Sequence, residues 1–150
     1  MLLTGVLAPP SITGAIVVFS VSEKNRDIVL VVDDEPNIIR AITVGLATAG
    51  FRVVVAENGA AGLDIFLSMK DEICLVIADV IMPAMGGQEM AAAIREINAD
   101  VKILLTSGYS DSVIKLAGKY DFPFVRKPFL IQDLVRKVAE VLGKSANASG

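Results

Sequence analysis

Four charged side chains directly follow apolar runs of this sequence and could together bind a cation and a phosphoryl group. Asp33 and Asp34 follow one such run, Asp79 follows a second and Lys127 a third. Open parallel sheets build their sites at the carboxyl ends of strands, so we expect these side chains to converge. Carboxylates about 4 Å apart repel by roughly 4 kcal/mol per pair at an effective dielectric constant near 20. Such a cluster takes up protons or binds a cation, and all-oxygen ligands favour Mg²⁺.

The elements that must position these residues are apparent from the hydrophobic pattern. Most of the apolar runs are nearly continuous, as expected of parallel strands covered on both faces. The run that begins at Arg52 is best explained as an edge strand. The predicted strands are 28–32, 52–56, 73–78, 101–106 and 123–126.

Helical patterns separate the predicted strands. A first helix is predicted between Pro36 and Gly50, and a second follows Asn58, a suitable N-cap residue. A third opens at Gly86-Gly87, and a fourth, short one begins near Ser110 and ends near Ala117. The last helix ends at Gly143, and its apolar stripe is Leu130, Leu134, Val138 and Val141.

Five successive strand–helix units predict the α/β class with right-handed crossovers. We expect a flavodoxin-like (βα)5 doubly wound parallel sheet with strand order 2-1-3-4-5. Pattern alone does not determine this order, which rests partly on analogy. The order makes the first and third strands neighbours, which brings Asp33, Asp34 and Asp79 together.

Composition excludes several classes of function. The 150 residues suffice for one domain, and the 53% hydrophobic content is that of a folded chain. The net charge of -3 argues against direct binding of nucleic acid. The chain has no histidine, which excludes histidine catalysis and histidine metal ligands, and Cys74 is its single cysteine. An internal disulfide is therefore impossible, and we expect a buried, inert thiol.

The two ends of the chain differ from the middle. Residues 1–26 are predicted to be an N-terminal extension of uncertain structure. A flexible segment or a remnant of an upstream module is favoured, and an added strand or helix and, last, membrane attachment are the alternatives. Their apolar runs are too short for a bilayer, which needs about 20 residues, so no membrane contact is expected. Residues 144–150 are predicted to be a flexible tail, which leaves 27–143 as the domain.

The motifs together resemble the receiver domain of bacterial two-component response regulators. They are the Asp33-Asp34 pair, Asp79 with Met82-Pro83 and Gly87, and Lys127-Pro128. The resemblance covers about residues 27–143 and implies that Asp79 accepts a phosphoryl group. One departure is Gly86, which stands where an acidic residue often sits, so this loop carries less charge than usual.

The resemblance also assigns roles to single residues. Asp34 would ligate Mg²⁺ directly, Asp33 would act largely through water, and Asp79 and the backbone carbonyl of Ile81 would complete the metal site. Lys127 would bind phosphate, and its bond to Pro128 is typically cis in the family. Thr106 resembles the switch hydroxyl and Phe124 the rotating aromatic switch. For Thr106 a plain strand residue, and for Phe124 a plain core residue, are the alternatives.

As a receiver, the chain would be a cytoplasmic signalling switch and not an enzyme. Its partners would be a histidine kinase or histidine phosphotransfer domain and a downstream protein target. The resemblance also allows a homodimer through the face formed by the fourth helix, fifth strand and fifth helix. The chain is either a stand-alone receiver or one cut from a larger hybrid sensor kinase.

Three other functions fit parts of the sequence. An aspartyl-phosphate phosphatase wants an acid two residues after its nucleophile, where this chain has Ile81. A flavin-binding domain conflicts with Asp33-Asp34-Glu35, whose charges would repel the phosphate of FMN. A receiver-like interaction module that works without phosphorylation ranks above both and below the switch.

Overall fold

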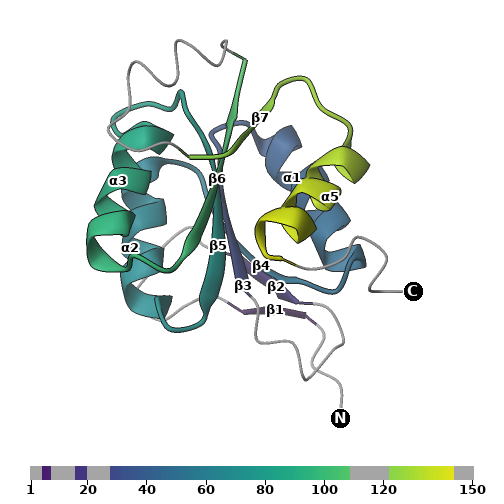
Figure 1. Ribbon diagram of the computed structural model, residues 1–150. Helices are drawn as coiled ribbons and strands as arrows, with labels where there is room; N and C mark the ends of the chain where they lie inside the picture. The colour runs from purple at the N-terminus through teal and green to yellow at the C-terminus, as the bar shows by residue number, and fades with distance from the viewer. Residues whose placement is uncertain (1–4, 8–15, 20–27, 109–121, 144–150) are drawn as a thin grey trace.

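A mixed seven-stranded sheet forms the centre of the computed structural model, and helices cover both of its faces (Figure 1). The structure describes residues 5–7, 16–19, 28–108 and 122–143. The strands are β1 (Gly5–Leu7), β2 (Ile16–Phe19), β3 (Ile28–Val32), β4 (Arg52–Ala56), β5 (Ile73–Asp79), β6 (Lys102–Ser107) and β7 (Phe124–Arg126). The helices are α1 (Pro36–Thr48), α2 (Gly59–Met69), α3 (Gly87–Ile97) and α5 (Ile131–Val141).

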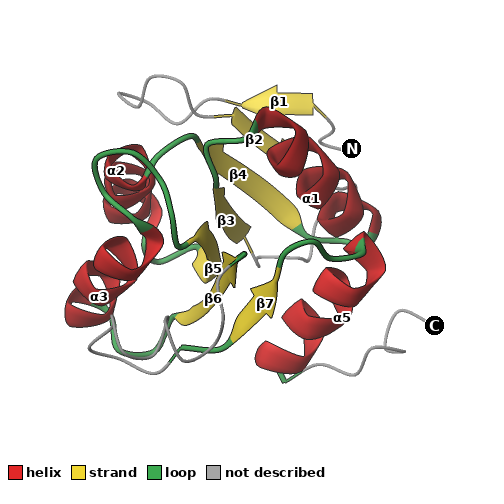
Figure 2. Ribbon diagram, turned by 90° about the horizontal axis from the view of Figure 1, so that it is seen from above, coloured by secondary structure: helices red, strands yellow, loops and turns green. Residues whose placement is uncertain are grey.

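The parallel part of the sheet has the predicted order. Strands β4, β3, β5, β6 and β7 lie side by side, which is the order 2-1-3-4-5 of the five predicted strands. Figure 2 shows α2 and α3 on one side of this sheet and α1 and α5 on the other. The predicted fourth helix, near 110–117, lies outside the described residues.

The strands alternate their buried side chains between two cores. Along β3, Leu30 and Val32 face the core under α2 and α3, whereas Val29 and Val31 face the core under α1 and α5. Each of these side chains is buried, which explains why the run is continuously apolar. Helices α1 and α5 contribute residues to the second core: Ile42, Leu46, Leu134 and Val138.

The N-terminal segment adds two strands, which agrees with the alternative of an added strand and not with the favoured flexible segment. Strand β2 pairs antiparallel with β4, with Val17 opposite Val54, and β1 pairs antiparallel with β2. The prediction that Arg52–Ala56 is an edge strand is therefore wrong, because β2 hydrogen-bonds to its outer side. The parallel order is unchanged, since both added strands lie beyond β4.

Helix boundaries follow the expected local signals, with one error. The side chain of Asn58 accepts a hydrogen bond from the N–H of Ala61 at 2.8 Å, as predicted for an N-cap. Gly86 is the residue that precedes α3, and Pro36 is the first residue of α1. Leu130, placed in the stripe of the last helix, instead precedes α5 and is 61% exposed.

Gly62 allows α2 to approach the sheet closely. A Cβ atom at this position would lie 2.8 Å from Cγ2 of Val32 and 2.8 Å from Sδ of Met90. Replacing Gly62 with alanine should therefore lower the free energy of unfolding by about 1–2 kcal/mol, because overpacking outweighs the better helix propensity of alanine. Chemical denaturation measures this change. Gly108→Ala is the control, since a Cβ there has no atom within 4 Å; a Gly62→Ala variant more stable than the wild type would contradict the packing argument.

Candidate phosphorylation and metal site

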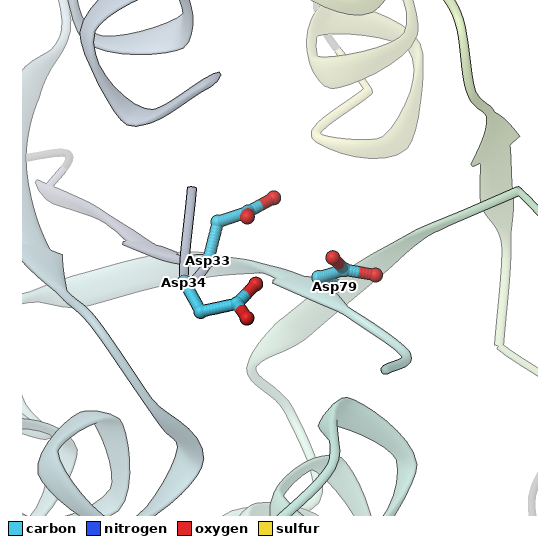
Figure 3. A group of neighbouring side chains, drawn as sticks. All are labelled: Asp33, Asp34 and Asp79. Atoms are coloured by element: carbon cyan, nitrogen blue, oxygen red, sulfur yellow. The ribbon is translucent and has the colours of Figure 1, made fainter. Parts of the chain in front are cut away.

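The carboxyl ends of β3 and β5 bring three carboxylates together. Ligand oxygens of Asp33, Asp34 and Asp79 all lie within 4.8 Å of one another, and Figure 3 shows the side chains of Asp33 and Asp34 extending toward Asp79. The parallel register explains the proximity, because Val32 of β3 pairs with Ala78 of β5. These two residues directly precede Asp33 and Asp79. Sequence reasoning placed these three residues together, and the structure does the same.

Lys127, the residue directly after β7, reaches the same cluster from the far side of β6. Its Nζ lies 2.9 Å from Oδ2 of Asp79, 3.1 Å from Oδ2 of Asp33 and 3.2 Å from Oε1 of Glu35. The Lys127 N–H donates to the carbonyl of Ser107 at 2.8 Å, which fixes the backbone beside β6. The peptide bond between Lys127 and Pro128 is cis, as expected.

Burial and pairing act in opposite directions on the charges of this site. Burial raises the pKa of the Asp33 carboxyl above its usual value, although the N–H of Glu35 and the ammonium of Lys127 lower it in part. Burial lowers the pKa of Lys127, but hydrogen bonds to Asp79 and Asp33 outweigh it, and the net pKa of Lys127 is raised. Lys127 therefore stays protonated at physiological pH and supplies a permanent positive charge.

Asp79 is held so that its buried carboxylate borders an open pocket. Its Oδ1 accepts the N–H of Ile81 at 3.2 Å and its Oδ2 accepts Lys127. Gly87 lies against the Asp79 backbone, where a Cβ would approach the Asp79 carbonyl carbon to 2.8 Å. An open pocket of about 320 Å³ lies over the carboxylate, with the lining residues Asp34, Glu35, Asp79, Ile81, Gly108 and Lys127.

The remaining predicted residues surround this pocket at different depths. Thr106 pairs with Asp79 across β5 and β6, is 1% exposed, and its carbonyl accepts the N–H of Val80 at 2.9 Å. It is the second-last residue of β6, not the last as predicted, because the strand continues to Ser107. Phe124 on β7 is half-buried and packs against the core under α2 and α3.

Sequence reasoning missed one member of the site. Glu35 was noted only for its charge beside Asp33-Asp34, yet its side chain binds Lys127. The available signal was its position two residues after Asp33 at the end of a strand and directly before Pro36 at the start of a helix. That signal predicts a location near the pocket but not the contact with Lys127.

The donor set fits a divalent cation. Three carboxylates that all present oxygen atoms make a hard-ligand site, and the neighbouring Lys127 suits a phosphoryl group. The geometry is therefore that of a metal-assisted phosphoryl site at the carboxyl edge of a doubly wound sheet.

Residues 29–139 match the family model of the response regulator receiver domain. The chain belongs to the response regulator receiver family. Members of this family are phosphoacceptor signalling switches, and the aspartate cluster at the edge of the sheet fits the phosphorylation site.

Relatives of known name share the receiver part of the chain. The response regulator receiver protein CpdR of Brucella abortus (strain 2308) is 29% identical over 118 residues, which cover 76% of this chain and 95% of CpdR. The sensor kinase CckA of the same strain is 31% identical over 118 residues, covering 77% of this chain. The chain spans 12% of the length of CckA and 27% of the Escherichia coli (strain K12) regulator GlrR.

Solved structures agree with the fold. A receiver domain protein from Clostridium thermocellum has a TM-score of 0.71 and 28% identity, covering 78% of this chain and 94% of that chain. The response regulator TrrA from Thermotoga maritima, in complex with Mg²⁺ and BeF, has a TM-score of 0.67 and 36% identity. The match with TrrA covers 77% of this chain and 98% of that chain.

Proposed function

We propose that this chain is a phosphoacceptor switch that receives a phosphoryl group on Asp79 with the help of Mg²⁺. The single observation that carries the proposal is the arrangement around Asp79. Its carboxylate lies in an open pocket, beside two further carboxylates and 2.9 Å from an ammonium. This set provides a nucleophile, a cation site and a phosphate-binding charge in one place.

The transfer follows from the placement of these groups. An oxygen of Asp79 attacks phosphorus, and the bond between phosphorus and the imidazole nitrogen of a phosphohistidine breaks. The donor imidazole keeps the electron pair and takes a proton from solvent. Lys127 holds a phosphoryl oxygen by charge-assisted hydrogen bonding. Since these 150 residues contain no histidine, the donor would lie outside them, in a histidine kinase or a histidine phosphotransfer domain.

Four groups would hold the metal. Asp34 and Asp79 would be direct ligands, Asp33 would act largely through water, and the backbone carbonyl of Ile81 would add a fourth oxygen. A bound Mg²⁺ supplies positive charge that offsets the charge on the transferring phosphoryl oxygens. The close Asp33–Asp34–Asp79 grouping supports this set.

The signal would pass from the site to the surface through Thr106 and Phe124. The Thr106 hydroxyl would bond a phosphoryl oxygen, and Phe124 would turn inward. The register supports the first part, because Thr106 lies directly beside Asp79. The face that would change, and through which a homodimer would form, consists of the fourth helix, β7 and α5; the fourth helix lies outside the described residues.

Residues 27–143 form the receiver unit in this proposal, and 1–26 and 144–150 are additions to it. The activity is signalling and not turnover of a substrate. The output would be contact with a downstream protein target and not with nucleic acid, and the setting would be the cytoplasm. Within the described residues, no helix is long and apolar enough to cross a membrane.

Intact-mass spectrometry after incubation with acetyl phosphate tests the proposal. The wild type should gain one phosphoryl adduct in the presence of Mg²⁺ and none after chelation, and Asp79→Asn should gain none, because an amide cannot form the acyl phosphate. Asp71→Asn is the control, since this exposed residue precedes β5 at its other end. A wild type without an adduct in any condition would instead favour an interaction module that works without phosphorylation.

A further inference from the structure

The ammonium of Lys127 has as many carboxylate partners as it has N–H donors. A protonated lysine offers three donors. Among the described residues, Asp33, Glu35 and Asp79 accept from it, at 3.1, 3.2 and 2.9 Å. A phosphoryl oxygen that binds Lys127 must therefore take over an N–H that Asp33, Glu35 or Asp79 occupies in the metal-free site.

The three partners differ strongly in burial. The side chain of Asp33 is 2% exposed and that of Asp79 is 9% exposed, whereas the side chain of Glu35 is 61% exposed. A buried carboxylate that loses Lys127 suffers the full penalty of desolvation unless a metal ion takes the place of the ammonium. An exposed carboxylate is rehydrated when it is released, and an exposed ion pair contributes little free energy. Glu35 is thus the partner that Lys127 gives up most easily.

The backbone of Glu35 keeps its side chain at the rim of the pocket. Its N–H donates to Oδ1 of Asp33 at 2.9 Å, and its carbonyl accepts from Ile38 and Ile39, both at 3.1 Å, at the start of α1. Only the side chain is free to move when the contact with Lys127 breaks. Glu35 also lies outside the cation cluster of Asp33, Asp34 and Asp79, so binding of a metal does not by itself remove it from Lys127.

We propose that Glu35 is a positioning residue that occupies the third N–H of Lys127 in the unphosphorylated site and is displaced by a phosphoryl oxygen. This inference rests on the proposed function. It makes Glu35 a competitor of the phosphoryl group: it holds the lysine in place at rest and opposes the phosphorylated state. The exchange also frees the carboxylate of the N-cap residue of α1, which links the state of the site to the start of that helix.

Beryllofluoride with saturating Mg²⁺ is the probe, because this phosphoryl mimic binds without a chemical step. Titration followed by amide NMR shifts gives its affinity for the full chain. Glu35→Gln should bind the mimic roughly two- to fivefold more tightly than the wild type, the size expected for loss of one exposed ion pair. Glu35→Asp should also bind it more tightly, because the shorter side chain withdraws from Lys127 while the charge remains.

Glu57→Gln is the matched control for net charge. Glu57 is an exposed carboxylate in the loop after β4, at the same carboxyl-terminal end of the parallel strands as Glu35. Within the part of the chain that the structure describes, it makes no ion pair with Lys127. Its replacement should leave the affinity for the mimic within twofold of the wild type. Thermal unfolding without metal shows whether a variant acts only by changing the structure. The melting temperatures of Glu35→Gln, Glu35→Asp and Glu57→Gln should all be close to that of the wild type.

The outcomes separate this inference from the proposed function. A wild type that binds no beryllofluoride with Mg²⁺ would overturn both. If the wild type binds the mimic but Glu35→Gln binds it equally or more weakly, the displacement of Glu35 is wrong while the switch stands. If Glu57→Gln matches the gain of Glu35→Gln and Glu35→Asp shows none, the effect is one of net charge and the proposed exchange is again wrong.

Discussion

Replacing Lys127 with methionine should slow phosphoryl transfer from acetyl phosphate to Asp79 by roughly 100- to 1,000-fold, the usual effect of removing one preorganised charge from a transition state. The ammonium lies 2.9 Å from the Asp79 carboxylate, where charge develops on the phosphoryl oxygens. Methionine has a similar length but supplies neither the charge nor the donors.

The same variant should bind Mg²⁺ more tightly than the wild type. Lys127 contacts Asp33 and Asp79, two of the three carboxylates in the cation cluster, so the ammonium and the metal compete for them. Rates from intact-mass spectrometry and affinities from Mg²⁺ titration measure the two effects. Lys102→Met is the control, because this exposed lysine is the first residue of β6 and lies at the end of the strand away from the site. A fall in both rate and Mg²⁺ affinity would show damage to the site as a whole and contradict the competition.

Asp34→Asn should remove most of the stabilisation that Mg²⁺ gives the protein. A ligand that binds only the folded state adds about 2.7 kcal/mol at 100 times its Kd, so the wild type should unfold at a clearly higher temperature with Mg²⁺. Among the described residues, Asp34 makes no ion pair with Lys127, so its carboxylate is available to bind the cation. The variant should therefore show almost no Mg²⁺-dependent rise in melting temperature.

Without metal, the order of stability should reverse. Asp34 lies within 4.8 Å of two other carboxylates, and like charges at that separation repel by about 1 kcal/mol even in water. The metal-free Asp34→Asn variant should exceed the wild type in free energy of unfolding by about 0.5–1 kcal/mol, as measured by chemical denaturation. Asp64→Asn, an exposed change on α2, is the control. If the variant is less stable than the wild type without metal, Asp34 has a structural role that the charge argument omits.

The sequence predicted the parallel strands accurately because their continuous apolar runs correspond to residues that are buried on both faces of the sheet. The predicted strands 28–32 and 52–56 match β3 and β4 to the residue, and the 2-1-3-4-5 order is confirmed. Both faces of these strands are buried, so the continuous apolar runs carried the information. The acidic cluster followed directly, since residues after neighbouring parallel strands share one edge.

Features that depend on contacts between distant residues were not predictable in the same way. Pairing of β2 with β4 joins segments more than 30 residues apart, and no local signal in 16–19 specifies it. Leu130 has the spacing of the last helical stripe, but the helix begins after it and leaves it exposed. The contact between Glu35 and Lys127 depends on the conformation of two loops. The sequence predicts that both loops lie at the carboxyl-terminal end of the strands, but it does not predict how their side chains are oriented.

The measurement that tests the central claim most directly is localisation of the phosphoryl group by reductive trapping. The full chain is incubated with acetyl phosphate and Mg²⁺, treated with borohydride, digested, and sequenced by tandem mass spectrometry. Borohydride reduces an aspartyl phosphate to homoserine and leaves a free carboxylate unchanged. We predict homoserine at position 79 and at no other aspartate, and its absence when Mg²⁺ is chelated. Homoserine at Asp33 or Asp34, or no trapped residue in a sample that carries the phosphoryl adduct, would contradict the assignment of Asp79 as the acceptor.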